Sequence, residues 1–240
     1  MRTDEFIAKL SDISKTNPAE FDRLRACIPL GVDGFQGVAV SHRENKVERY
    51  HHTCVSGGFK TEFIKRLTLT LACLYEREEA AFLILSPYLT YGELMTLKNA
   101  DITVPFVRNA EDLRMAQSCL QEIARTRGEI GLAPKLFVVL DGIETLTEGD
   151  TALMSYRPFL DTVGTSGIEI ISGVDLSKTV FAGYPGGFVG VGNCLVTTGG
   201  SGSADLTYVN LDTSMSLPKA ITFPSAPSVA EAIAFLNGLE

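Results

Sequence analysis

Two short, uninterrupted runs of apolar residues constrain the fold of this chain more than any other feature. They are Ala81–Leu85 (AFLIL) and Leu136–Leu140 (LFVVL). Strands that are buried on both faces of a sheet read as continuous hydrophobic runs, whereas half-exposed strands alternate. The spacing of apolar residues predicts a helix over 60–77 before the first run. A second, long helix, opened by Asn109 as its N-cap, is predicted to end near Arg127. Strands alternating with helices in this way are typical of a parallel sheet covered on both faces.

The rest of the chain adds weaker elements to this plan. We expect an N-terminal helical extension over residues 1–27 and a single compact domain over residues 28–240. The fold class is α/β, with three layers, a mainly parallel sheet and an antiparallel edge hairpin. The further predicted elements are helices at 4–15, 19–26 and 151–163, strands at 103–107 and 168–171, a hairpin from 38–40 and 47–55, and the edge hairpin from Cys194–Thr197 and Leu206–Val209.

Composition excludes several classes of protein. The 240 residues carry 29 acidic and 21 basic side chains, a net charge of −8, and this balance argues against nucleic acid as a partner, because phosphate neutralisation needs a basic face. No apolar run approaches the ~20 residues of a membrane span, so we expect no direct membrane insertion. Five scattered cysteines without a CxxC pair suit buried thiols in a reducing compartment. We therefore expect a cytoplasmic domain.

A candidate phosphate loop follows the first strand of the regular part of the chain. The segment Cys54–Thr61 (CVSGGFKT) ends in Lys60-Thr61, as the loop G-x-x-x-x-G-K-[ST] does, and includes Gly57 and Gly58. In that loop, backbone N–H groups surround a phosphate, the lysine reaches phosphate oxygens, and the hydroxyl holds Mg²⁺. Here Cys54 stands at the first glycine position and Phe59 at the second, or else the loop is three residues too short. The alternative is a tight strand-to-helix turn with Lys60 and Thr61 in solvent.

A second candidate lies at the end of the strand that contains Leu136–Leu140. Asp141 follows four apolar residues, and an aspartate at that place can orient the Mg²⁺ shell of a bound nucleotide. Gly142 comes next, so the first acid that could polarise water is Glu144. The alternative, that the Asp141 carboxylate caps the following turn, is equally compatible with the sequence.

The order of these segments resembles the FtsK/SpoIIIE motor domain, a RecA-like P-loop member of the HerA/FtsK class, over residues 28–210. Four further segments carry the resemblance: Ile28–Asp33 at the family's entry segment, Leu85–Leu94 at its Asp-Pro-Lys and Glu-Leu pattern, Ala110–Arg127 at its long helix, and Gly167–Ile171 at the strand before its sensor. In that likeness, Phe137–Asp141 corresponds to the Walker B strand. The resemblance implies ATP as ligand, with Gly57, Gly58, Lys60 and Thr61 at the phosphates, Thr61 and Asp141 at Mg²⁺, and Asp141 with Glu144 as the catalytic pair.

The departures from the family pattern all weaken hydrolysis. They are Phe59 for the loop glycine, Gly142 for the catalytic acid, Ser86 and Tyr88 for the family's aspartate and lysine, and Asp175 for the sensor glutamine. Degenerate copies of this kind occur in type VII secretion membrane ATPases, whose last motor repeat is implicated in recognising exported proteins. The resemblance therefore implies a pseudo-ATPase module with weak or no nucleotide binding and no resident cofactor.

Three functions follow as hypotheses. The first is a module that recruits a secreted protein substrate or packs against neighbouring motor domains, in a ring oligomer in the full-length context. The second is an active ATPase that uses ATP and Mg²⁺ to translocate protein or DNA. The third is an α/β domain without a ligand, retained for assembly.

Overall fold

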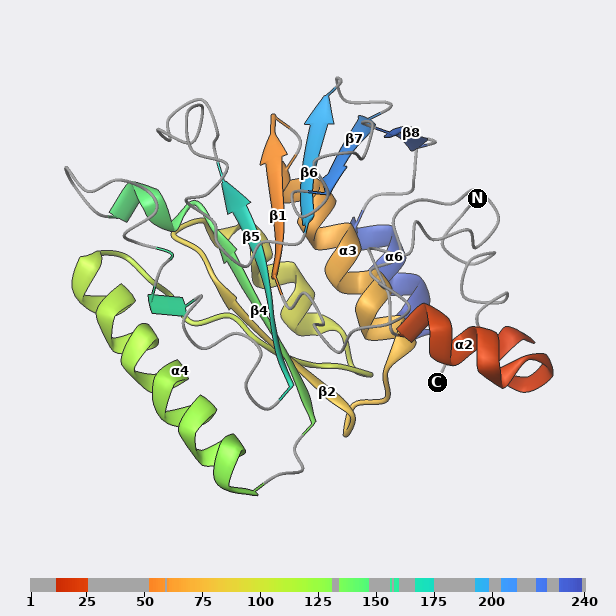
Figure 1. Cartoon of the computed structure of the whole chain (residues 1–240), viewed down its shortest axis with the longest axis horizontal. Coiled ribbons are helices and arrows are strands. Elements are labelled where there is room, and N and C mark those ends of the chain that lie inside the picture. Colours follow the sequence, from red (N-terminus) through yellow and green to blue (C-terminus); the bar gives the residue numbers. More distant parts are fainter. Residues whose placement is uncertain are drawn as a thin grey trace.

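The computed structural model describes residues 12–25, 52–58, 60–130, 134–146, 156, 158–159, 167–174, 193–198, 204–210, 219–223 and 229–238. Its core is one eight-stranded sheet with the order β3-β2-β4-β5-β1-β6-β7-β8 (Figure 1). The strands are β1 (His52–Gly57), β2 (Ala80–Leu85), β3 (Asp101–Thr103), β4 (Lys135–Asp141), β5 (Ile168–Val174), β6 (Asn193–Thr198), β7 (Ala204–Asn210) and β8 (Lys219–Phe223).

Pairing within the sheet is parallel from β3 to β6 and antiparallel from β6 to β8. The two apolar runs pair directly with each other: Ala81 lies opposite Leu136 and Leu85 opposite Leu140. Parallel strands need crossover connections, and α3 (Lys60–Leu74) and α4 (Ala110–Ile130) lie in those between β1 and β2 and between β3 and β4. The mainly parallel α/β sheet and the antiparallel β6–β7 hairpin are confirmed, but the predicted edge position is wrong, because β8 pairs with β7 and forms the edge.

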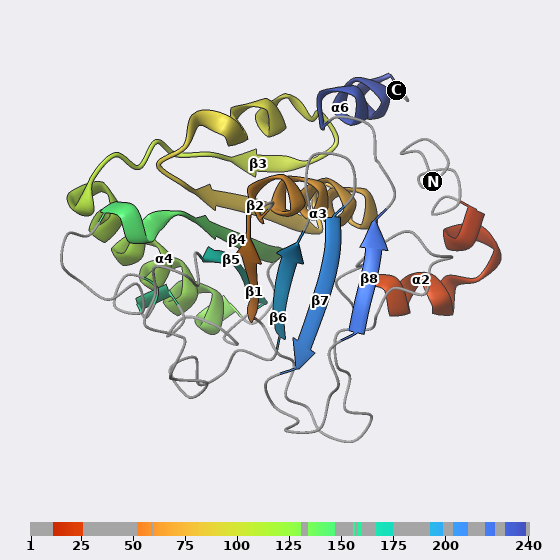
Figure 2. The same ribbon diagram turned by 90° about the horizontal axis from the view of Figure 1, so that it is seen from above.

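The two faces of the sheet bury different hydrophobic clusters. Alternate residues of β4 face different clusters. Phe137 and Val139 face the cluster under α3, whereas Val138 and Leu140 face the cluster under α4. A period of two along a strand produces this alternation. Figure 2 shows α3 and α4 on opposite sides of the sheet, so the fold has three layers.

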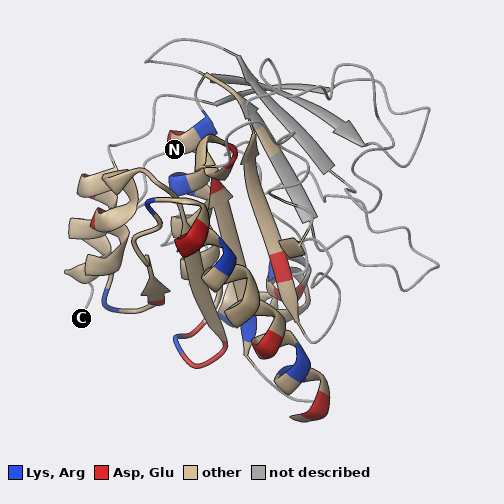
Figure 3. Ribbon diagram, turned by 90° about the vertical axis from the view of Figure 1, so that its left-hand side faces the viewer, with Lys and Arg blue, Asp and Glu red and all other residues tan. Residues whose placement is uncertain are grey.

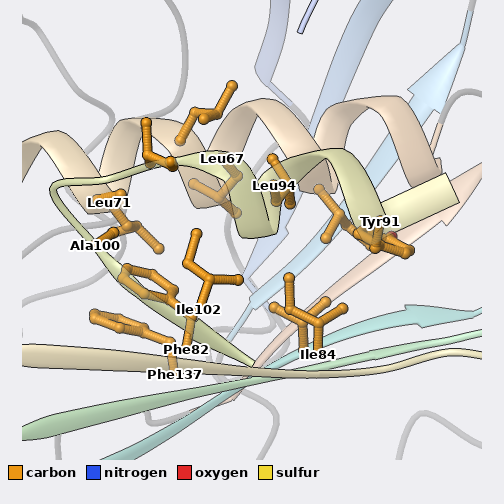
Figure 4. Packing of buried hydrophobic residues seen from close by; sticks show 14 of the residues in the cluster. Leu67, Leu71, Phe82, Ile84, Tyr91, Leu94, Ala100, Ile102 and Phe137 are labelled. Atoms are coloured by element: carbon orange, nitrogen blue, oxygen red, sulfur yellow. The ribbon is translucent and has the colours of Figure 1, made fainter. Parts of the chain in front are cut away.

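A 3₁₀ helix and the C-terminal helix complete the layer that holds α3. The 3₁₀ helix η1 (Leu89–Thr96) follows β2, and α6 (Val229–Asn237) packs beside it. The Asn237 side chain joins them, since its amide donates to the Thr96 carbonyl at 2.8 Å and its oxygen accepts from the Lys98 N–H at 3.0 Å. In Figure 4, Tyr91 and Leu94 of η1 point into the same cluster as Leu67 of α3. The position of η1 is therefore held from both sides.

The N-terminal helix α2 (Pro18–Arg25) packs against the far end of α3. Arg25 forms an ion pair with Glu79 at 2.7 Å and lies over the Tyr75 ring, while the Tyr75 hydroxyl donates to the Arg25 carbonyl at 2.6 Å. The predicted helix at 19–26 is thus confirmed within one or two residues. The division into residues 1–27 and 28–240 stays a prediction.

Several predicted boundaries differ from the structure. The strand expected at 103–107 lies at Asp101–Thr103, and beyond it only Phe106 makes a bridge, to Ser86. Pro105 has no N–H to donate to a ladder, which accounts for the earlier end. Helix α3 ends at Leu74, not at residue 77. The predicted helix at 4–15 is described only from residue 12, and that at 151–163 only at residues 156, 158 and 159. The first strand of the hairpin, at 38–40, lies outside the described residues, as do Ile28–Asp33, Phe59 and Asp175.

The aromatic cluster under α3 generates a first prediction. Phe137 is 1% exposed, with its ring 5.1 Å from that of Phe82 and 5.5 Å from that of Tyr75. Replacing Phe137 by alanine removes these contacts and leaves a cavity, so we expect a loss of ~3–5 kcal/mol in the free energy of unfolding. Urea denaturation measures it, with Ile130→Ala as the control, because Ile130 is 66% exposed. Equal losses in the two variants would contradict the packing described.

Candidate functional site

The connection between β1 and α3 is short. β1 runs to Gly57 and α3 begins at Lys60, so Gly58 and Phe59 alone lie between them. Gly57 has a φ of +105°, a conformation that glycine adopts at little cost, and it turns the chain from strand to helix. Gly58 is exposed, and a Cβ added there would meet no heavy atom within 4 Å. The two glycines thus serve a tight turn.

The segment that corresponds to the front of a phosphate loop lies inside the sheet. Cys54 pairs with Ser172 of β5 and Cys194 of β6, and Ser56 pairs with Val174 and Val196. Backbone groups engaged in ladders on both sides cannot also surround a phosphate, whose binding in a P-loop relies on free N–H groups. Within the described residues, the N-terminus of α3 is the part of this connection that still presents such groups.

Three predicted site residues lie together at the carboxyl end of β4. Asp141 is 0% exposed, and its carboxylate accepts hydrogen bonds on both oxygens. The Lys60 ammonium donates to Oδ1 and forms an ion pair with it, and the Thr61 hydroxyl donates to Oδ2 at 2.7 Å. The structure therefore brings Lys60 and Thr61 to Asp141, which lies 81 and 80 positions away from them in the sequence.

A tyrosine that the sequence does not single out completes this network. The Tyr91 hydroxyl, from η1, donates to Asp141 Oδ2 at 2.8 Å, and Tyr91 is itself 0% exposed. Burial, together with the negative charge of Asp141 and the bond to it, raises the pKa of Tyr91 well above its usual range. The hydroxyl consequently stays protonated and serves as a donor. No sequence signal links Tyr91 to Asp141, because 50 residues separate them.

Charged side chains also tie η1 to α3. The Lys65 ammonium pairs with the Glu93 carboxylate at 2.6 Å and lies 6.0 Å from the centre of the Tyr91 ring. The Lys65 side chain is 10% exposed and that of Glu93 36%. This partly buried pair fixes the face of η1 that presents Tyr91 to Asp141.

One glycine, Gly173, makes room for the Asp141 carboxylate. A Cβ on Gly173 of β5 would lie 2.4 Å from Asp141 Oδ1 and 2.7 Å from the Ile64 side chain, closer than real Cβ atoms approach. Asp141 and Gly173 are direct neighbours across the β4–β5 ladder. Glycine at position 173 thus gives the carboxylate its room, a requirement that becomes visible only in the paired sheet.

Glu144, the second predicted catalytic acid, is engaged elsewhere. It lies in the 3₁₀ helix η2 (Ile143–Leu146), and its carboxylate accepts a hydrogen bond from the Tyr156 hydroxyl at 2.6 Å. The same hydroxyl lies 2.9 Å from the Gly173 carbonyl. The contacts of Glu144 therefore lead to Tyr156, and through it to β5.

The oxygens of Thr61 and Asp141 are of the type that Mg²⁺ prefers, and Lys60 is a suitable phosphate ligand. Lys60 and Thr61 are both bonded to Asp141, however, and the ladders of β1 leave no loop among the described residues to wrap a β-phosphate. The described residues also contain no group of three or more His, Cys, Asp or Glu side chains positioned to hold a metal ion. In this arrangement, no described loop surrounds the position that the β-phosphate of a nucleoside triphosphate would take.

Charge elsewhere on the described surface is mixed. Figure 3 shows acidic and basic residues interleaved along α4, where Arg125 pairs with Glu122 and Glu129 at 2.5 Å each. In the part of the chain that the structure describes, no helix is both long and apolar enough to cross a membrane.

Comparison with known proteins places the fold. No family model and no curated protein matches the chain by sequence. Among solved structures, the cytoplasmic domain of the type VII secretion ATPase EccC from Thermomonospora curvata matches with a TM-score of 0.61 at 15% identity, covering 89% of this chain and 31% of that one. EssC (ATPases 2 and 3) from Geobacillus thermodenitrificans matches with a TM-score of 0.54 at 14% identity, covering 78% and 44%.

The fold is thus similar to that of domains of these type VII secretion ATPases. The cytoplasmic domain of EssC matches as well, with a TM-score of 0.52 at 12% identity, covering 91% of this chain and 47% of that one. The predicted likeness to an FtsK/SpoIIIE-type, RecA-like domain is confirmed at the level of fold. This chain spans less than half the length of each of these three proteins.

The buried ion pair generates a prediction about Lys60. Replacing Lys60 by methionine leaves the Asp141 carboxylate buried with only its two hydroxyl partners. Removing one member of a buried pair costs ~3–5 kcal/mol, and the 15% exposure of the Lys60 side chain places the expected loss near the lower end. Chemical denaturation measures this loss. The control is Arg66→Met, because Arg66 forms a partly exposed ion pair with Glu62. Equal stability of Lys60→Met and wild type would contradict the network.

Gly173 supplies a second prediction. Gly173→Ala places a methyl group against Asp141 Oδ1 and Ile64, so we expect a loss of ~1–3 kcal/mol from overpacking. Gly58→Ala is the matched control, because its added methyl group meets open space. Thermal unfolding of both variants measures the difference, and a Gly173→Ala protein as stable as Gly58→Ala would show that Asp141 does not need this room.

Proposed function

We propose that this chain is a degenerate FtsK/SpoIIIE-type ATPase domain that works as a cytoplasmic module of a protein secretion motor. Its role is to recruit a secreted protein substrate or to pack against neighbouring motor domains, with weak or no nucleotide binding and no resident cofactor. The likeness in fold to EccC and EssC, which are type VII secretion ATPases, supports the secretion context.

The observation that carries the proposal is the path of β1. The strand pairs with β5 through Ser56 and with β6 through Gly57, and the helix starts three positions after Gly57. A triphosphate therefore meets a helix N-terminus without the wrapped loop that normally precedes it. Two further observations support the same proposal: Gly142 follows Asp141 where an acid would serve hydrolysis, and Glu144 is bonded to Tyr156.

One observation favours an alternative, an active ATPase that translocates protein or DNA. Lys60 and Thr61 each donate a hydrogen bond to Asp141 at the carboxyl edge of a parallel sheet, where ligands of such folds bind. In this alternative, Lys60 binds phosphate, Thr61 and Asp141 serve Mg²⁺, and Glu144 polarises water after leaving Tyr156.

Mg-ATP titration separates the two functions. A ligand present at a hundred times its Kd stabilises a protein by ~2.7 kcal/mol, which raises the Tm of a domain of this size by about 5–11 °C. We expect no such shift at millimolar Mg-ATP, and no phosphate release above that of Lys60→Ala. A Tm shift in the wild type that disappears in Lys60→Ala would overturn the proposal and favour the active ATPase.

A further inference from the structure

The carboxyl end of β4 is covered by an aromatic ring from the segment that follows β2. A Cβ on Gly142 would lie 2.4 Å from Cε2 of Tyr88 and 2.8 Å from both its Cζ and its hydroxyl oxygen. Gly142 is buried and has a φ of +73°, which disfavours any other residue even without the ring. The Tyr88 ring therefore occupies the space that a side chain at position 142 would take, and such a side chain would have to displace the ring.

Local contacts hold the Tyr88 backbone in this position. The Tyr88 N–H donates to the Ser86 hydroxyl at 3.1 Å, and Ser86 is 2% exposed and bridged to Phe106. On its other side, Tyr88 leads directly into η1, which Tyr91 anchors to Asp141. Tyr88 is 40% exposed, so one part of the side chain meets solvent while the part against Gly142 covers buried backbone.

We propose that Tyr88 is a steric plug, matched to Gly142, which keeps side chains and solvent away from the end of β4 beside Asp141. Hydrolysis needs a water molecule and a group that activates it close to the phosphate. Glycine at position 142 supplies no activating group, and the Tyr88 ring takes the space beside it that a water molecule would need. The plug deepens the proposed function, on which it rests for the premise that this site does not hydrolyse ATP.

An experiment can distinguish a matched fit between Tyr88 and Gly142 from incidental packing of the Tyr88 ring. In a matched pair, the cost of a side chain at 142 depends on whether the ring is present, and the two substitutions are coupled. If the ring only packs loosely over the backbone, the costs of the two substitutions add.

A double-mutant cycle of Gly142→Ala and Tyr88→Ala tests the coupling. We expect Gly142→Ala to lower the Tm of the wild type by about 8 °C, through the clash and the positive φ together. In Tyr88→Ala, where only the backbone strain is left, the same substitution lowers the Tm by about half as much. Equal decreases in both backgrounds would overturn the proposal.

Amide hydrogen exchange tests the exclusion of solvent with single variants. The Gly142 N–H donates to the Gly173 carbonyl at 3.4 Å, so this amide belongs to the residue that the ring approaches. We expect Tyr88→Ala to speed exchange of this amide by on the order of tenfold, while Tyr88→Phe, which keeps the ring, leaves it unchanged. Leu89→Ala is the matched control, because Leu89 is adjacent and 75% exposed. Exchange at wild-type rates in Tyr88→Ala would overturn the proposal.

The two proposals fail in different ways. Mg-ATP binding by the wild type would overturn the proposed function and leave the coupling of Tyr88 with Gly142 as measured. Additive Tm changes, with unaltered exchange in Tyr88→Ala, would remove the plug and leave the Mg-ATP result unaffected.

Discussion

The buried carboxylate of Asp141 organises the structure around the carboxyl end of β4. Asp141 is 0% exposed, and an isolated buried carboxylate costs several kcal/mol unless it is paired and hydrogen-bonded. Its partners come from two elements: Lys60 and Thr61 from the first turn of α3, and Tyr91 from η1. Satisfying one charge therefore fixes the start of a helix and a connecting segment against the central strand. The Lys65–Glu93 pair and the Asn237 side chain hold η1 in the same place from its other sides.

The same contacts bear on the proposal that this site does not hydrolyse ATP. Lys60, Thr61 and Asp141 match the chemistry of phosphate and Mg²⁺ binding, yet in this structure they are one another's partners. A ligand would have to replace these bonds at a buried site, and the ladders of β1 leave little backbone to compensate it. The path of the β1 main chain, more than the identity of the side chains, supports the proposal of a module that does not hydrolyse ATP.

The parallel sheet was predictable because its signal is local. Continuous apolar runs such as Leu136–Leu140 are typical of strands buried on both faces, and both runs lie where expected. Helix α6 was missed although Val229, Ala232, Ile233 and Leu236 follow helical spacing and are buried. The 3₁₀ helix η1 was missed for a physical reason, because its residues lack the 3.6-residue period that identifies an amphipathic α-helix.

By itself, the sequence determined the α/β class, the alternation of strands and helices, and the turn chemistry at Gly57, because these depend on neighbours along the chain. It also supplied Lys60, Thr61 and Asp141 as candidates. Only the tertiary structure decided that these three meet, that Tyr91 joins them, that Gly173 makes room for the carboxylate, and that Tyr88 covers Gly142. Such contacts depend on which strands pair and in which register, and that information belongs to the folded sheet as a whole.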